Sequence, residues 1–404
     1  MDKIKFDIIK KVAEVSFKIK ALKDISMLNS NSPPSVFIGS KLKYPLVNVG
    51  IISPFERDEN AWVYDDARYW ADNNFKINDV LKIRSSLINS RFQSNVNDAA
   101  INNSNFIKIA QEIAVASKPV DVEIELKKKA GLFFGQKRDR ILAPQGMQAG
   151  LKKARITGNI SVDNKLDKVI NDDIKASESV LYLYNNNFDE YSLSKILSVG
   201  VLGFRKSRRL VPTRWSITAT DDILGLNLIK EINDFPWIEN YELFFGEFMG
   251  NRYLILFFPG VWSYELFELY LPGSSWNPTN EVKASTDYED NYGRKNYASA
   301  TAGGYYASRL PVLEYLKRIK KQASVLAIRI ETPGYWAALG VWVVRESVRK
   351  TIENRKLFFA SLKEITDSSK KIGMIKFGFD PSAIFKKSKI IDCLKTQANL
   401  SNWL

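Results

Sequence analysis

The pattern of apolar and polar positions predicts a chain in which helices and strands are mixed. Residues 3–23 repeat apolar side chains at steps of four and three, which places them on one face of a helix. Residues 120–126 alternate apolar and acidic positions, as in a strand with one wet face. Runs at 36–38 and 47–52 are rich in β-branched residues and are bounded by Gly and Pro, so they predict strands and tight turns.

The same patterns predict the remaining elements. Helices are expected over 79–88, 105–117, 189–198, 305–323, 336–355 and 357–366. Strands are expected over 179–184 and 324–331, with a β-meander over 242–246, 251–259 and 262–271. Residues 29–34 and the long polar segment 272–304 are predicted to be loops. Asp380 and Pro381 have the chemistry of a helix start, and this last helix is expected to reach about Lys395.

These elements together predict the α+β class, with mixed sheets surrounded by helices in one large body and a flexible C-terminal tail. The expected divisions are an N-terminal amphipathic basic helix over 1–30, an α+β core over 31–379, a C-terminal helix over 380–396 and the tail over 397–404. Two interpretations of the N-terminal helix are open. It either docks on the core or binds a membrane surface or a partner. No apolar run is long enough for a transmembrane helix or a signal peptide, so we expect a cytoplasmic protein.

Charge narrows the choice of partners. The 404 residues include 59 Lys and Arg against 45 Asp and Glu, which gives a formal net charge of +14. Such a surplus favours nucleic acid, an anionic membrane or acidic proteins. The alternative explanation of this charge is a soluble protein from an organism whose proteins are generally basic.

The absence of histidine excludes several classes of chemistry. The chain has no His and one Cys, Cys393, so it has no Ser-His-Asp triad, no Cys-His pair and no His-ligated metal. A structural zinc site is excluded for the same reason. A catalytic metal would have to be held by carboxylates, which points to Mg²⁺ or Mn²⁺.

One short segment concentrates cations ahead of an aromatic residue. The residues concerned are Arg205, Lys206, Arg208, Arg209, Arg214 and Trp215. Arginine side chains fit phosphates with two parallel hydrogen bonds, and a tryptophan can stack on a base. The alternative is a basic surface turn that leads into a buried strand.

Acidic residues follow this segment and recur later in the chain. Asp221, Asp222, Asp287 and Glu289 are the candidates for holding Mg²⁺ in phosphodiester hydrolysis. Asp221 can equally cap a helix over 223–232, and the acids near 287 can simply be solvated. Arg294 and Lys295 are candidates for phosphate contact.

The last eight residues have the pattern Gln-x-x-Leu-x-x-Trp-Leu. It resembles the clamp-binding box of proteins that dock on PCNA-type sliding clamps. Its matching residues are Gln397, Leu400, Trp403 and Leu404. In such boxes a 3₁₀ turn places the apolar side chains in one pocket, while the glutamine occupies a polar side pocket. The alternative is a chance match in which Trp403 folds back on the protein.

Several internal stretches resemble the archaeal Nre family of DNA-repair proteins. They are SPPSVFIG (32–39), YPLVNVGIISP (44–54), RRLVPTRWSITATDD (208–222), GRKNYASATAGGYYASRLPVLEYL (293–316) and QASVLAIRIETPGYWAALGVWVVRESVRK (322–350). The resemblance implies an accessory factor in DNA-damage repair with a C-terminal clamp-binding box. Some relatives carry a cysteine-rich zinc region near the N-terminus, which residues 3–23 lack here.

The leading prediction is therefore a DNA-repair accessory factor that binds nucleic acid through basic residues and the PCNA clamp through its tail. A metal-dependent phosphodiesterase or nuclease is the alternative from a different class. A structural hub without nucleic-acid contact is the third.

Overall fold

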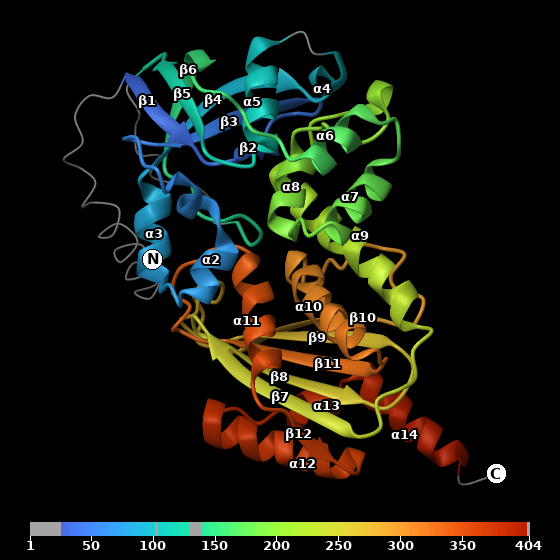
Figure 1. The fold of residues 1–404 in the computed structure, drawn as a ribbon. Coiled ribbons are helices and arrows are strands. Elements are labelled where there is room, and N and C mark those ends of the chain that lie inside the picture. Colours follow the sequence, from blue (N-terminus) through green and yellow to red (C-terminus); the bar gives the residue numbers. More distant parts are fainter. Residues whose placement is uncertain (1–25, 102–103, 129–138, 402–404) are drawn as a thin grey trace. The chain divides into compact units, whose positions relative to one another are not determined.

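The computed structural model describes residues 26–101, 104–128 and 139–401 (Figure 1). The chain divides into two compact units, and the division falls between Leu224 and Gly225. We call them the N-terminal unit and the C-terminal unit. The sequence predicts one core over 31–379 rather than two units, and the predicted helix over 3–23 lies outside the described residues.

The N-terminal unit is built on a six-stranded sheet. Its strands are β1 (Met27–Ser32), β2 (Val36–Gly39), β3 (Leu46–Pro54), β4 (Leu87–Asn95), β5 (Val120–Leu126) and β6 (Met147–Ile156). Their order across the sheet is β1-β5-β6-β4-β3-β2. The pair β4 and β6 is parallel, and the other neighbouring pairs are antiparallel.

Strand β5 has the wet face that its alternating sequence predicts. Its apolar residues are buried and its acids are half-buried. The acids face cations of the neighbouring strand: Glu123 pairs with Arg155, and Glu125 pairs with Lys152. The basic run on β6 is therefore partly neutralised across the ladder.

Helices surround this sheet. They are η1 (Ala61–Asp65), α2 (Ala67–Asp72), α3 (Ile77–Ser85), α4 (Asp98–Ile101), α5 (Asn105–Val115), α6 (Asn164–Asn171), α7 (Ala176–Asn185), α8 (Glu190–Ser198) and η2 (Arg205–Ser207). Helix α5 packs on β2, β3 and β6, because its buried residues Ile107, Ala110 and Ile113 share one face. Helix α9 (Thr213–Ile232) begins in this unit.

The C-terminal unit contains a second six-stranded sheet. Its strands are β7 (Tyr241–Phe248), β8 (Asn251–Phe258), β9 (Ser263–Tyr270), β10 (Lys283–Glu289), β11 (Ser324–Glu331) and β12 (Leu357–Phe359). Their order is β10-β9-β11-β8-β7-β12. Strands β9 and β11 run parallel, whereas the other neighbouring pairs are antiparallel.

Both faces of this sheet are covered. Helices α10 (Gly303–Ile319) and α11 (Trp342–Glu353) lie on one face, and α12 (Leu362–Ile372), α13 (Ser382–Phe385) and α14 (Lys389–Ser401) lie on the other (Figure 1). The apolar core fills the face beneath α12 to α14, where Leu256, Phe267 and Ile328 pack with Ile365 and Ile390. Because side chains alternate along a strand, the neighbours of these residues point toward α10 and α11.

Several sequence predictions agree with these elements and others do not. The helices expected over 79–88, 105–117 and 189–198 and the strand expected over 324–331 are confirmed, with boundaries shifted by a few residues. The strand predicted over 179–184 is wrong, since α7 occupies it, and its buried Val180 and Leu183 are spaced as in a helix. The loop predicted over 29–34 is largely strand β1, which pairs with β5.

The C-terminal unit also corrects the expected β-meander. Strands β7 and β8 form a hairpin, but β11 lies between β8 and β9. The segment 272–304, predicted to be a loop, contains strand β10, and residues 357–359 are a strand rather than the start of a helix. The helix expected from Asp380 is divided into α13 and α14, and Asp380 accepts hydrogen bonds from the Ser382 backbone N–H and hydroxyl.

Candidate nucleic-acid interface

The segment before α9 is held in place by hydrogen bonds to two other parts of the N-terminal unit, the end of α8 and strand β2. The Val211 N–H donates to the Ser198 carbonyl at 2.8 Å, and the Ser198 hydroxyl donates back to the Val211 carbonyl at 2.7 Å. The Ile38 N–H donates to the Thr213 hydroxyl at 2.8 Å. Trp215, in the first turn of α9, is thereby fixed relative to the sheet.

This segment and the loop between β2 and β3 enclose a groove of about 200 Å³. We call it the Tyr44–Trp215 groove. Its floor is apolar and includes the buried residues Val47, Val96 and Leu210. At its rim Tyr44 is 62% exposed and Trp215 is 53% exposed. Exposed aromatic side chains beside an apolar floor are typical of a surface that binds a partner.

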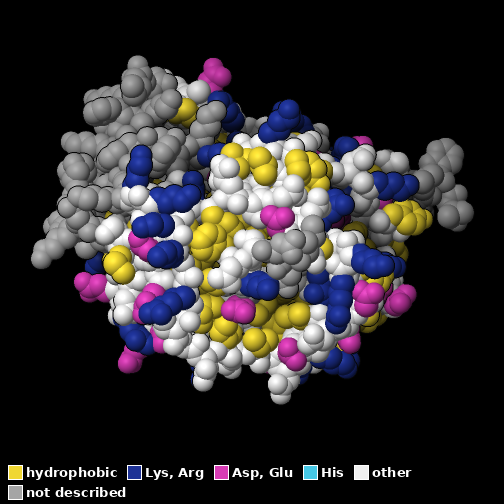
Figure 2. Space-filling view, turned by 90° about the horizontal axis from the view of Figure 1, so that it is seen from above, with side chains coloured by type: hydrophobic (Ala, Val, Ile, Leu, Met, Phe, Trp, Pro, Cys, Tyr) yellow, Lys and Arg dark blue, Asp and Glu magenta, His cyan; other side chains and the backbone are white. Residues whose placement is uncertain are grey.

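Cations are present on both segments that form this groove. Arg209 lines it, and its guanidinium donates to the Tyr44 hydroxyl at 3.3 Å. Lys41 and Lys43 lie in the same loop as Tyr44, and both are exposed. None of the described residues that line the groove is acidic. On one face of the molecule, Figure 2 shows Lys and Arg side chains interspersed with exposed hydrophobic ones.

Two of the predicted phosphate-binding arginines make contacts inside the protein. Arg208 donates to the carbonyls of Gly203 and Ile170, and burial, followed by the nearby charge of Arg205, lowers the pKa of its guanidinium. The guanidinium of Arg205 donates to the Asn171 carbonyl at 2.8 Å. Arg208 thus ties its segment to the end of α6.

The other cations of this segment differ in exposure. Lys206 is exposed on η2, and Arg209 is exposed at the groove. The Arg214 side chain is 40% exposed, and its Nη1 lies 3.9 Å from a carboxylate oxygen of Asp139. The cluster that the sequence indicated therefore contains both anchoring and solvent-facing cations, and its role in phosphate binding stays a prediction.

The first pair of predicted catalytic acids lies inside helix α9. The helix begins at Thr213, so the expectation that Asp221 caps a helix starting at 223 is wrong. An acidic pair before an apolar run is typical of a helix start, which is why the sequence suggested a cap. In the structure this pair lies within a helix that has already begun at Thr213. Asp221 is buried and Asp222 is half-buried.

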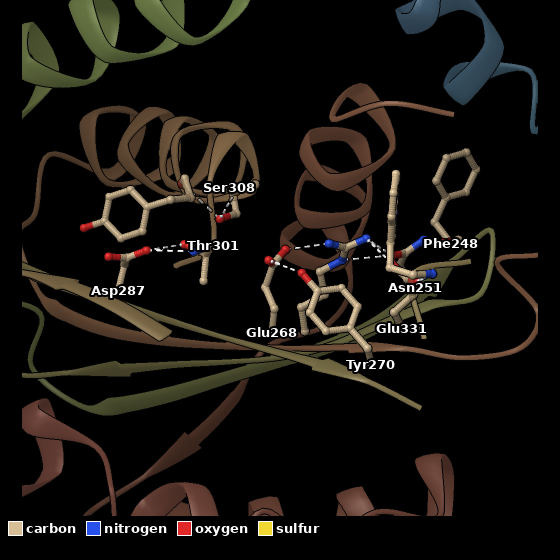
Figure 3. A network of polar contacts seen from close by, with 12 residues as sticks. Phe248, Asn251, Glu268, Tyr270, Asp287, Thr301, Ser308 and Glu331 are labelled. Carbon is tan, nitrogen blue, oxygen red and sulfur yellow. Dashed lines mark hydrogen bonds and ion pairs between the residues drawn. The ribbon is translucent and has the colours of Figure 1, made fainter. Parts of the chain in front are cut away.

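The second pair lies in β10 of the C-terminal unit, and arginines contact both acids. Asp287 accepts from the Thr301 N–H and hydroxyl at 2.8 and 2.9 Å (Figure 3). Arg294 pairs with Asp287 at 3.1 Å. Glu289 is buried and accepts from Arg309 at 2.7 Å. Burial raises the pKa of Glu289, while Arg309 opposes that rise. Lys295 is exposed.

Sequence reasoning missed a buried polar network on the α10 and α11 side of this sheet (Figure 3). Arg329 donates to Glu268 on β9, to Glu331 at 3.0 Å and to the Asn251 amide oxygen at 2.9 and 2.6 Å. The Tyr270 hydroxyl donates to Glu268 at 2.6 Å. All of these side chains are buried.

Two carboxylates, Glu268 and Glu331, share the Arg329 guanidinium in this network. Burial, opposed by Arg329 and reinforced by Glu268, raises the pKa of Glu331 to about 7. The signal in the sequence was the presence of charged residues inside the otherwise apolar strands β9 and β11. Between 26 and 401, outside the two gaps, no group of three Asp, Glu or Cys side chains is arranged to hold a metal ion.

The tail is described only in part. Helix α14 extends to Ser401, so the backbone at Gln397 and Leu400 is helical. Trp403 and Leu404 lie outside the described residues. The clamp-binding box therefore stays a prediction.

Comparison with known proteins gives a consistent result over nearly the whole chain. The sequence profile "Archaeal Nre, N-terminal" matches residues 1–277, and "Archaeal Nre, C-terminal" matches residues 289–403. A Haloferax volcanii protein named DNA repair protein NreA is 38% identical over 83% of this chain and 81% of its own length. Two Archaeoglobus fulgidus proteins, named DNA repair proteins NreA and NreB, are 37% and 36% identical over 88% and 83% of this chain and 88% and 82% of their own lengths.

No solved structure matches this chain. Among the residues that the structure describes, none of the helices combines the length and hydrophobicity needed to cross a bilayer.

Proposed function

The chain belongs to the archaeal Nre family, and from this premise we propose that it serves DNA repair as an accessory factor. In this proposal the N-terminal unit binds DNA around the Tyr44–Trp215 groove, and the C-terminal tail docks on a PCNA-type sliding clamp. The names of the relatives support the role in DNA repair.

The observation that carries DNA binding is the combination of exposed aromatics and cations at one groove. Trp215 and Tyr44 are exposed over an apolar floor, and Arg209 lines the same groove. Lys41 and Lys43 are exposed in the loop that carries Tyr44. Cations supply affinity for phosphates that does not depend on sequence. Aromatic side chains supply stacking surfaces for bases.

A titration of labelled DNA with the full chain tests this proposal. Fluorescence anisotropy at two salt concentrations measures both the affinity and its dependence on salt. If cations bind phosphates, the logarithm of the association constant falls linearly with the logarithm of salt concentration. Absent or salt-insensitive binding would favour the structural hub instead.

Clamp docking is supported by the spacing of Gln397, Leu400, Trp403 and Leu404. A tryptophan and two leucines can supply several kcal/mol of apolar contact before ordering costs. Truncation after Lys395 should abolish binding to the clamp and leave the melting temperature unchanged. The matched pair is Trp403→Ala, which should weaken clamp binding, and Asn399→Ala at a spacer position, which should not.

The carboxylate-dependent nuclease receives less support from the contacts. Asp287 already pairs with Arg294, and Glu289 with Arg309, so both acids are compensated without a metal. Incubation of labelled DNA and RNA with the full chain, with and without Mn²⁺, tests for cleavage. A cleavage activity that requires Mn²⁺ and is lost in Asp221→Ala would favour the enzyme.

A further inference from the structure

We propose that the Tyr44–Trp215 groove holds one unpaired base, so that the protein prefers single-stranded or locally unpaired DNA to an intact duplex. The inference rests on the proposed DNA binding and adds the form of DNA that is recognised. Four observations carry it: the size of the groove, its apolar floor, the exposed aromatics at its rim and the surrounding charge.

The size of the groove suits a single ring system. Its volume of about 200 Å³ is below the roughly 300–1,000 Å³ of sites for drug-sized ligands. Its floor includes Val96, Leu210 and Pro212, which offer no side-chain hydrogen bonds to the edge of a base. Such a site binds the face of a base by stacking and tolerates different sequences.

Trp215 is placed for stacking before any ligand arrives. It lies in the first turn of a long helix whose start is fixed by the bond from the Ile38 N–H to the Thr213 hydroxyl. An ordered aromatic side chain loses little conformational entropy on binding, which favours affinity. Tyr44, on the opposite segment, is held by the hydrogen bond from Arg209.

The charge around the groove favours nucleic acid over an apolar peptide. Arg209 is exposed and lines the groove, and the start of α9 adds the positive end of a helix dipole. Lys41 and Lys43 are exposed in the loop that carries Tyr44. Phosphates on either side of an inserted base would meet these groups. A base inside an intact duplex keeps its face covered by its neighbours, so it reaches such a groove only after unstacking.

Three DNAs of equal length distinguish this inference from general DNA binding. They are a labelled oligothymidylate, a duplex and a single strand made of abasic nucleotides. We expect the full chain to bind oligothymidylate more tightly than the other two, because only it offers free bases. Trp215→Ala should weaken binding of oligothymidylate about tenfold or more and weaken duplex binding much less, while Trp215→Phe should retain most of the affinity.

Trp237→Ala is the matched control, since Trp237 is also 53% exposed and lies in the other unit. The inference is overturned if the abasic strand binds as tightly as oligothymidylate, or if Trp215→Ala behaves like Trp237→Ala. It is also overturned if Trp215→Ala alters only self-association in sedimentation, which would make the groove an interface between copies.

The double variant Lys43→Ala with Arg209→Ala separates this inference from the proposed function. If the double variant weakens binding of every DNA while Trp215→Ala weakens none, the proposed DNA binding is supported and the proposed base site is refuted. If the unmodified protein binds none of the three DNAs, both fall.

Discussion

The Arg309 guanidinium donates to the Glu289 carboxylate at 2.7 Å, and neither side chain is exposed to solvent. This pair joins α10 to β10 inside the C-terminal unit. A buried charge without its partner is costly, because it has lost its hydration and gained nothing in exchange. The pair therefore makes a sharp test of the described fold.

Arg309→Leu should lower the free energy of unfolding by about 3–5 kcal/mol, because it leaves Glu289 buried without its cation. Urea unfolding followed by circular dichroism measures this. Lys317→Leu is the control on the same helix, since Lys317 pairs with Glu231 near the surface and should cost about 1 kcal/mol or less. Equal losses in the two variants would contradict the buried pair.

Gly225→Ala should destabilise the protein, although alanine normally stabilises a helix interior by roughly 0.5–1 kcal/mol. Gly225 lies in α9, and a methyl group there would come 2.7 Å from the Arg309 Nη2 atom. In an Arg309→Lys background, which lacks that atom, the same substitution should cost less. A rise in melting temperature for Gly225→Ala alone would show that the helix and Arg309 are not in contact.

Glu331 should make stability depend on pH. Its pKa is raised from 4.5 to about 7 in the folded protein, so the folded state holds the proton more tightly than the unfolded state does. The stabilisation from this proton is present below pH 4.5 and is lost as the pH rises to 7. Glu331→Gln keeps a neutral side chain, and its stability relative to the unmodified protein should therefore increase between pH 5 and pH 8.

Urea unfolding at the two pH values checks this, with Glu239→Gln at an exposed position as the control. The control should have the same effect at both values. If Glu331→Gln also changes stability equally at both pH values, Glu331 is ionised in the folded protein at both. In that case the pKa of its carboxyl is not raised by burial.

Arg209→Ala should reduce the salt dependence of DNA binding. Each lost phosphate contact lowers the slope of log affinity against log salt by about 0.7 for a single strand. Lys363→Ala removes an exposed charge in the C-terminal unit and should leave the slope unchanged. An unchanged slope in Arg209→Ala would mean that Arg209 serves only to hold Tyr44.

The fold class follows from the sequence wherever one periodicity dominates. Strand β5 alternates strictly, and α5 repeats its apolar residues at helical spacing, so both were predicted. Helix α7 was not, because the run Val180–Tyr184 is rich in residues that favour strands, and packing overrode that preference. The position of β11 between β8 and β9 also escaped prediction, because strand order depends on contacts between distant segments.

The candidate site shows the same limit. The sequence singled out Trp215 and its cations, but Tyr44 belongs to a distant loop that only the fold brings near. Arg208 and Arg209 look alike in the sequence, and yet one contacts backbone carbonyls while the other faces the groove. Tertiary packing decides which charged side chains are accessible to a ligand, and the local sequence pattern does not predict it.

Tyr44 and Arg209 stand 165 positions apart in the chain and meet across one hydrogen bond. The groove therefore forms only when both the first sheet and the start of α9 have folded. An unfinished or partly unfolded chain keeps its positive charge but has no place for a base. If the groove holds a base as proposed, damage to the sheet would remove the preference for exposed bases and leave only charge-dependent affinity for nucleic acid.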